Sequence, residues 1–166
     1  PIGNAILMRM GIYSDKVHDV KDIPDGATIA IPNDPTNGGR GLLLLQRAGL
    51  LKLKDGVGMK ATPKDVVDNP KHLKFKELEA AQLPRSLADV DAAAITMNYV
   101  MSGGLDVKKQ NIFLEPKDEP LAVMIIAARN KDKDKEAYKA FVKAYQSEAV
   151  KKFIADKYKG TIEPAF

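Results

Sequence analysis

The sequence predicts an α/β fold with a largely parallel β-sheet. Short apolar segments typical of buried strands alternate along the chain with segments typical of helices. Residues 121–128 are apolar throughout, as expected of a strand that is buried on both faces. With 45% hydrophobic residues among 166, the chain can also bury a core of ordinary size.

The first half of the chain is predicted to hold two strands and two helices. Residues 5–12 are apolar enough for a buried strand and lead to a short helical turn at residues 17–23. Residues 27–31 predict a second strand, followed by a polar, glycine-containing loop and a helix that ends at Gly49. A shorter helix is expected over residues 62–68, because Thr62-Pro63-Lys64-Asp65 has the pattern of a capping box with proline in the first turn.

The second half is predicted to contain short alternating elements and two longer helices. Strands are expected at residues 73–78, 91–95, 112–114 and 121–128, and helical turns at residues 83–87 and 97–101. Residues 133–144 and 147–157 have the amphipathic pattern of helices. In the first of these, an apolar face predicts packing into a core rather than a ligand-binding box; it consists of Tyr138, Phe141, Val142 and Tyr145.

The segment from Ile31 to Gly41 offers the first candidate site. It joins a predicted strand to a predicted helix, and backbone N–H groups at a helix N-terminus suit an anion. Arg40 adds a guanidinium that can bind a carboxylate or phosphate bidentately. The segment lacks the endings of a P-loop and of a dinucleotide-binding loop, so nucleotide binding is the weaker interpretation. Ordinary turn chemistry with a solvated arginine is the alternative at this point.

Composition and charge argue against several functional classes. There is no cysteine, which excludes disulfides, thiol catalysis and thiolate metal ligands. His18 and His72 stand apart among charged residues and are expected at the surface, so no metal site is predicted. The net charge of +4 is small and lysines alternate with acids, which argues against a dedicated nucleic-acid-binding protein. No apolar run approaches the roughly 18 residues of a membrane span. No nucleophile–base pair or cofactor motif is found, so we expect neither an enzyme nor a cofactor.

Several motifs together are similar to one known family. They are Tyr13-Ser14, Pro24-Asp25-Gly26-Ala27, Pro32-Asn33-Asp34-Pro35-Thr36-Asn37 with Gly39-Arg40, Leu42-Leu43-Leu44-Leu45-Gln46, Leu53-Lys54-Asp55-Gly56-Val57-Gly58, Glu77-Leu78-Glu79-Ala80 with Gln82-Leu83-Pro84-Arg85, and Ala144-Tyr145-Gln146-Ser147. In these motifs the chain resembles the NlpA-type methionine-binding lipoproteins, the substrate-binding proteins of bacterial methionine ABC importers. The resemblance covers nearly the whole chain.

The resemblance implies a periplasmic-binding-protein-like (type II) fold, in which two α/β lobes are joined by crossing strands. Family members are expected to carry a further N-terminal half of the first lobe, with an apolar ligand wall and a lipidated cysteine. We therefore expect this chain to hold one complete lobe and the C-terminal part of the other. Residues 1–13 are expected to form a crossing strand from lobe I, residues 14–118 lobe II, and residues 119–166 the returning strand and C-terminal helices of lobe I.

The same resemblance implies a set of ligand-binding residues. Arg40 matches the arginine expected to anchor the ligand carboxylate, and a buried carboxylate does need a charged, bidentate partner. Asn98 matches a family asparagine after a buried strand, where a helix cap is an equal explanation; Asn37 lies in the motif that contains Arg40. Thr96 and Val123 stand where the family has asparagines. Because Val123 cannot hydrogen-bond to an amino group, its presence is expected to cost about 1–3 kcal/mol of binding.

Two functions follow from these residues. The first is a substrate-binding protein that captures methionine or a related small amino acid or peptide and delivers it to the membrane subunits of an ABC importer. The second is a ligand-altered or ligand-free surface lipoprotein that acts as an interaction module, which Thr96 and Val123 favour. Either would be periplasmic or at the cell surface, held by an N-terminal lipid expected to lie outside these residues. Unpaired lobe I edges also predict a domain-swapped homodimer.

Overall fold

The computed structural model describes the whole chain, Pro1–Phe166, as two compact units. One unit is discontinuous and consists of Pro1–Arg9 and Pro116–Phe166; the other is the continuous stretch Met10–Glu115. The assignment of these units to lobes I and II stays a prediction. So do the predicted boundaries near residues 13 and 118. The strands are β1 (Gly3–Leu7), β2 (Met10–Tyr13), β3 (Thr28–Pro32), β4 (Lys52–Leu53), β5 (Val66–Asp68), β6 (Lys74–Leu78), β7 (Ala92–Thr96), β8 (Asn111–Leu114), β9 (Val123–Ile126) and β10 (Glu163–Pro164). The helices are α1 (Pro35–Arg47), α2 (Leu83–Ser86), α3 (Met97–Ser102), α4 (Val107–Gln110), α5 (Glu136–Tyr145) and α6 (Glu148–Tyr158).

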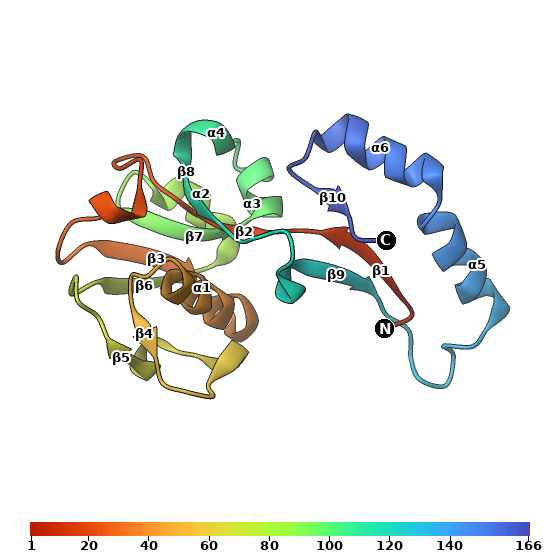
Figure 1. Cartoon of the computed structure of the whole chain (residues 1–166), viewed down its shortest axis with the longest axis horizontal. Coiled ribbons are helices and arrows are strands. Elements are labelled where there is room, and N and C mark those ends of the chain that lie inside the picture. Colours follow the sequence, from red (N-terminus) through yellow and green to blue (C-terminus); the bar gives the residue numbers. More distant parts are fainter. The chain divides into compact units, whose positions relative to one another are not determined.

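The continuous unit is built around a five-stranded sheet with the strand order β6-β3-β7-β2-β8 (Figure 1). Strand β3 pairs parallel with β6 and β7, whereas β2 pairs antiparallel with β7 and β8. The sheet is therefore mixed, but β8 runs in the same direction as β3, β6 and β7, and only β2 runs against them, so the prediction of a largely parallel sheet is confirmed for this unit. Strand β2 is the strand by which the chain enters this unit, so no crossover connection sets its direction, whereas β7 and β8, which run in the same direction, are joined through α3 and α4.

Helix α1 packs on one face of this sheet (Figure 1). Leu42 and Leu45 are fully buried and share a core cluster with Ile29 and Ile31 of β3. Ala30, between the two isoleucines, is also fully buried, so its side chain is covered on the opposite face of the sheet, where β3 contacts α2. Burial on both faces explains why β3 and β7 are apolar without alternation.

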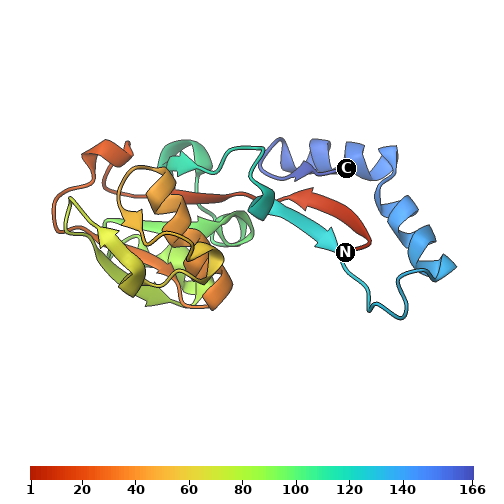
Figure 2. The same cartoon turned by 60° about the horizontal axis from the view of Figure 1, so that its bottom comes forward.

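The discontinuous unit contains a three-stranded antiparallel sheet, β10-β1-β9, together with α5 and α6 (Figure 2). Strand β9 is shorter than the predicted 121–128 because a 3₁₀ turn, Pro120–Ala122, precedes it. It is not buried on both faces, since Ile125 is 51% exposed. The prediction that the aromatic face of α5 packs into a core is also wrong for Tyr138 and Phe141, which are 38% and 55% exposed.

Other predicted elements are confirmed with two corrections. Strands β3, β6, β7 and β8 and helices α2, α3, α5 and α6 lie where the sequence predicts them, and α1 ends before Gly49, which has the positive φ of a helix-terminating glycine. Residues 5–12 form two strands in different sheets, β1 and β2, rather than one. The capping box at Thr62 and Asp65 is present, but it begins only a 3₁₀ turn, Pro63–Asp65, which is followed by β5. No helix has both the length and the apolar character needed to cross a bilayer.

Candidate ligand-binding site

The polar loop before α1 is much shorter than predicted. Helix α1 begins at Pro35, so Arg40 lies inside the helix and the loop consists only of Asn33 and Asp34. Asp34 is the N-cap: one of its carboxylate oxygens accepts a hydrogen bond from the backbone N–H of Asn37 at 3.0 Å. The side-chain amide of Asn37 donates to both oxygens of the same carboxylate at 3.1 Å. An acidic side chain thus already occupies this helix N-terminus, and the prediction that its backbone N–H groups bind an anion is wrong. The Asp-Pro pair was the sequence signal for this earlier start.

The glycines of α1 serve close packing. A Cβ atom on Gly39 would lie 2.1 Å from the carbonyl oxygen of Met59, and one on Gly38 would lie 2.7 Å from the carbonyl oxygen of Pro32. Real Cβ atoms essentially never come this close to a backbone atom. The glycines let α1 approach the main chain on two sides, so the glycine-containing segment needs no ligand to explain it.

Arg40 is buried, with 4% of its surface exposed, which makes the alternative of a solvated arginine wrong. Its Nε donates to Oε1 of Glu115 at 2.8 Å, and its Nη2 donates to Oε2 of the same carboxylate at 2.5 Å. Oε2 also accepts the backbone N–H of Met10 at 2.6 Å. This is the bidentate geometry in which arginine binds a carboxylate. Sequence reasoning missed Glu115, because 75 residues separate the two charges and only the fold brings them together.

Thr96 lies close to this network through the strand register. It is the last residue of β7, is 7% exposed, and stands opposite Met10 of β2. Asn98 follows in α3 and is exposed. Its alternative explanation as a helix cap is wrong, because Thr96 is the N-cap residue. The carboxyl ends of strands in an α/β sheet are where ligands usually bind, and β7 brings Thr96 and Asn98 to such an end.

The remaining predicted residues lie elsewhere. The side-chain amide of Asn37 is engaged by Asp34, so its role in the structure is to reinforce the start of α1. Val123 belongs to the discontinuous unit, where it begins β9 and pairs in register with Leu7 of β1. Within the continuous unit, the strand register and hydrogen bonds associate Arg40 and Thr96 through Met10 and Glu115. The role of each residue in ligand binding stays a prediction.

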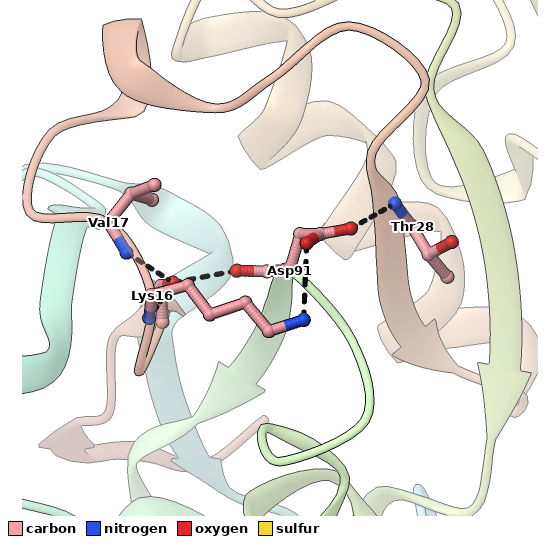
Figure 3. A network of polar contacts seen from close by, with 5 residues as sticks. Lys16, Val17, Thr28 and Asp91 are labelled. Atoms are coloured by element: carbon pink, nitrogen blue, oxygen red, sulfur yellow. Dashed lines mark hydrogen bonds and ion pairs between the residues drawn. The ribbon is translucent and has the colours of Figure 1, made fainter.

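A second polar network is structural (Figure 3). Asp91, just before β7, accepts hydrogen bonds from the backbone N–H of Thr28 at 2.8 Å and from Nζ of Lys16 at 3.2 Å. The hydroxyl of Ser14 donates to the carbonyl oxygen of Asp91 and accepts the backbone N–H groups of Lys16 and Val17. The hydrogen bond from Thr28 holds the pKa of the Asp91 carboxyl below its ordinary value, against burial, which raises it, and with help from Lys16. This network fixes the turn after β2, so the Tyr13-Ser14 motif has a folding role.

Comparison with known proteins identifies the family. The family model described as NlpA lipoprotein matches residues 1–166. The chain belongs to this family. The "Probable D-methionine-binding lipoprotein MetQ" of Pasteurella multocida (strain Pm70) is 48% identical over 149 residues, which cover 90% of this chain and 54% of that protein. The "D-methionine-binding lipoprotein MetQ" of Escherichia coli (strain K12) is 50% identical over 151 residues, which cover 90% of this chain and 55% of that protein. The chain therefore spans about half the length of these curated relatives.

Solved structures of similar proteins agree with this fold. A nutrient-binding protein from Burkholderia cenocepacia, solved bound to methionine, matches with a TM-score of 0.92 and 48% identity over 99% of this chain and 69% of its own. An ABC transporter periplasmic substrate-binding protein from Coxiella burnetii matches with a TM-score of 0.90 and 41% identity over 99% of this chain and 68% of its own. The predicted α/β fold of the periplasmic-binding-protein type is therefore confirmed, and the chain corresponds to about two thirds of these structures.

Proposed function

We propose that this chain is part of a substrate-binding protein that captures methionine or a related small amino acid or peptide and delivers it to an ABC importer. The observation that supports this proposal is the buried, bidentately bound guanidinium of Arg40 near the carboxyl end of β7. The proposal is also supported by the 48% identity of this chain to a protein whose structure was solved with methionine bound. The action is binding without catalysis, in a lipoprotein held at the membrane on the periplasmic or outer side of the cell.

Arginine is well suited to anchor the carboxylate of a free amino acid. The guanidinium is always charged, and its five N–H donors form a planar fork. Because Arg40 is already buried by the fold, little of its own hydration remains to be lost when a ligand arrives. In the proposed mechanism the ligand carboxylate binds at Arg40 and closure of two lobes excludes water from it. The membrane subunits of the importer would then receive the ligand.

The second candidate function is that of a relative with an altered ligand or with none. Thr96 and Val123 support it, since the family resemblance places asparagines at these positions. A hydroxyl at Thr96 offers fewer hydrogen bonds than an amide, and the side chain of Val123 offers none. In this case the chain acts as an interaction module of a surface lipoprotein. The domain-swapped homodimer stays a prediction that no observation in this structure supports.

Isothermal titration calorimetry with L- and D-methionine tests the proposal. We would titrate two proteins: the purified chain, and the same chain preceded by the N-terminal part of the Burkholderia cenocepacia relative. We expect micromolar or tighter binding by at least one of them. Arg40→Lys should weaken it at least tenfold by removing the planar fork, while Glu79→Gln, a charge change at an exposed side chain, should leave it unchanged.

Two outcomes distinguish the candidate functions. No heat from either folded protein would contradict the amino-acid receptor. In that case Val123→Asn is the decisive variant, because an added hydrogen-bond acceptor for an amino group should restore roughly tenfold or more in affinity if only the ligand contacts have changed. Continued absence of binding in that variant would favour the ligand-free interaction module.

A further inference from the structure

Met10 and Glu115 are the first and last residues of the continuous unit, so the chain passes between the units at these two places. They are hydrogen-bonded to each other. The backbone N–H of Glu115 donates to the carbonyl oxygen of Met10 at 3.0 Å, and the backbone N–H of Met10 donates to Oε2 of Glu115 at 2.6 Å. We call the stretches of chain that pass between the units at Met10 and at Glu115 the two crossing segments. They are thus hydrogen-bonded to each other at the ends of this unit.

Arg40 adds a third element, helix α1, to this junction. The carboxylate of Glu115 accepts hydrogen bonds from Nε and Nη2 of Arg40 and from Met10, and it is 3% exposed. Each of these donors is buried as well. A shift of either crossing segment relative to α1 would lengthen hydrogen bonds to a charge that has little access to water, which is costly in a medium of low dielectric constant.

The burial of this ion pair is informative in itself. Two other ion pairs of the same unit are more exposed: the side chains of Lys16 and Asp91 are 46% and 26% exposed, and those of His72 and Asp25 are 77% and 74% exposed. A buried ion pair is an inefficient way to stabilise a fold, because apolar residues of similar volume are often as stabilising or more so. Its presence at the junction of the crossing segments therefore points to a role in positioning.

We propose that Glu115 is a positioning residue for Arg40. Its carboxylate neutralises and orients the guanidinium, prevents it from binding small inorganic anions, and couples its orientation to the two crossing segments through Met10. For the amino-acid ligand this inference rests on the proposed function: occupation of Arg40 by a ligand carboxylate and the geometry of the crossing segments then influence each other.

Sulfate is the probe that tests whether Glu115 keeps other anions from binding to Arg40. Glu115→Gln keeps the size of the side chain and an oxygen acceptor but removes the negative charge. We expect its thermal midpoint to fall and then to rise with the logarithm of sulfate concentration in the millimolar range, as for a specifically bound anion. The wild type, Glu79→Gln and the double variant Arg40→Met/Glu115→Gln should show only the small general effect of sulfate. If Glu115→Gln is unfolded in low salt, sulfate-induced folding is the same readout.

Methionine calorimetry gives the second readout, one that a merely structural role would not change. In a protein that binds methionine, sulfate should leave the Kd of the wild type and of Glu79→Gln unchanged. Glu115→Gln should bind methionine at least tenfold more weakly, and added sulfate should weaken it further by competition at Arg40. Glu115→Asp, which keeps the charge, should recover most of the affinity and be insensitive to sulfate.

The sulfate titration and the methionine calorimetry can contradict the positioning role and the proposed function independently of each other. A Glu115→Gln variant that responds to sulfate no more than Glu79→Gln, or that stays unfolded at every sulfate concentration, would overturn the positioning role. So would unchanged methionine affinity without sulfate competition. If the wild type binds no methionine, the proposed function fails. The sulfate titration still decides whether Glu115 keeps other anions from binding to Arg40.

Discussion

Gly39→Ala is predicted to destabilise the continuous unit although alanine is the better helix former. The added Cβ would lie 2.1 Å from the carbonyl oxygen of Met59 and 3.4 Å from the backbone nitrogen of Ala61. Carbon and oxygen atoms in contact are usually roughly 3.3 Å or more apart, so α1 or the main chain at Met59 must move by about 1 Å. Both are backbone, and the turn at Met59 is held by the hydrogen bond from Ala61 N–H to the carbonyl oxygen of Gly58.

Two opposing contributions set the magnitude of this effect. Replacing glycine by alanine inside a helix stabilises it by about 1 kcal/mol. Overpacking costs typically about 1–3 kcal/mol, and a clash with backbone at this distance belongs at or above the upper end. We therefore expect a net loss of about 2 kcal/mol in the free energy of unfolding. For a unit of this size, that corresponds to a fall of roughly 8 °C or more in the melting temperature.

Gly41→Ala is the matched control for this experiment. It lies in the same helix and is buried, but the nearest atom to its Cβ would be a side-chain carbon, Cβ of Ala94, at 3.3 Å. We expect it to change stability by less than about 1 kcal/mol, because the gain in helix propensity offsets a small packing cost. Urea unfolding followed by circular dichroism measures both variants. If Gly39→Ala is as stable as Gly41→Ala, close approach to Met59 is not what requires glycine.

The remaining predictions concern two aspartates of the same unit. The pKa of Asp91 is lowered in the folded state, chiefly by the Thr28 hydrogen bond, so its stabilisation is present above the unfolded pKa and is lost as the pH falls through the folded pKa. Urea midpoints measured from neutral pH into the acid range should therefore fall less steeply for Asp91→Asn than for the wild type, and equal slopes would contradict this role. Asp34→Ala should cost about 1 kcal/mol of unfolding free energy through loss of the N-cap bond to Asn37, whereas Asp34→Asn should cost only a few tenths. The same urea series measures both, and equal losses would show that capping by Asp34 is unimportant.

Local patterns predicted many elements of the continuous unit because they report local physics. The run at residues 27–31 is apolar apart from Thr28, short, and preceded by Asp25-Gly26, which is typical of a strand covered on both faces, and β3 is such a strand. Gly49 predicted the end of α1 because its left-handed backbone suits glycine. The same kind of signal misled at Thr62: its capping box is formed, but nothing in a four-residue motif says how far the helix continues.

The sequence predicted only part of the candidate site. Arg40 was identified by its side-chain chemistry and by the motif around it, whereas its burial and its partner Glu115 were not. Charge pairs distant in sequence leave no periodic trace, and an acid that ends an apolar strand is common. The glycines before Arg40 were also misassigned, because a close approach between a helix and a distant carbonyl is invisible in the sequence.

By itself, the sequence determined the family, the α/β class and the positions of most strands and helices, since these depend on motifs and on neighbours a few residues apart. The tertiary structure alone decided that the sheet is mixed and that α1 packs against Met59. It also decided that Arg40 is neutralised by Glu115 at the point where the chain enters and leaves the unit. The physical reason is that these features arise from groups brought together over tens of residues, where register, close packing and the exclusion of water act, and none of these has a local signature.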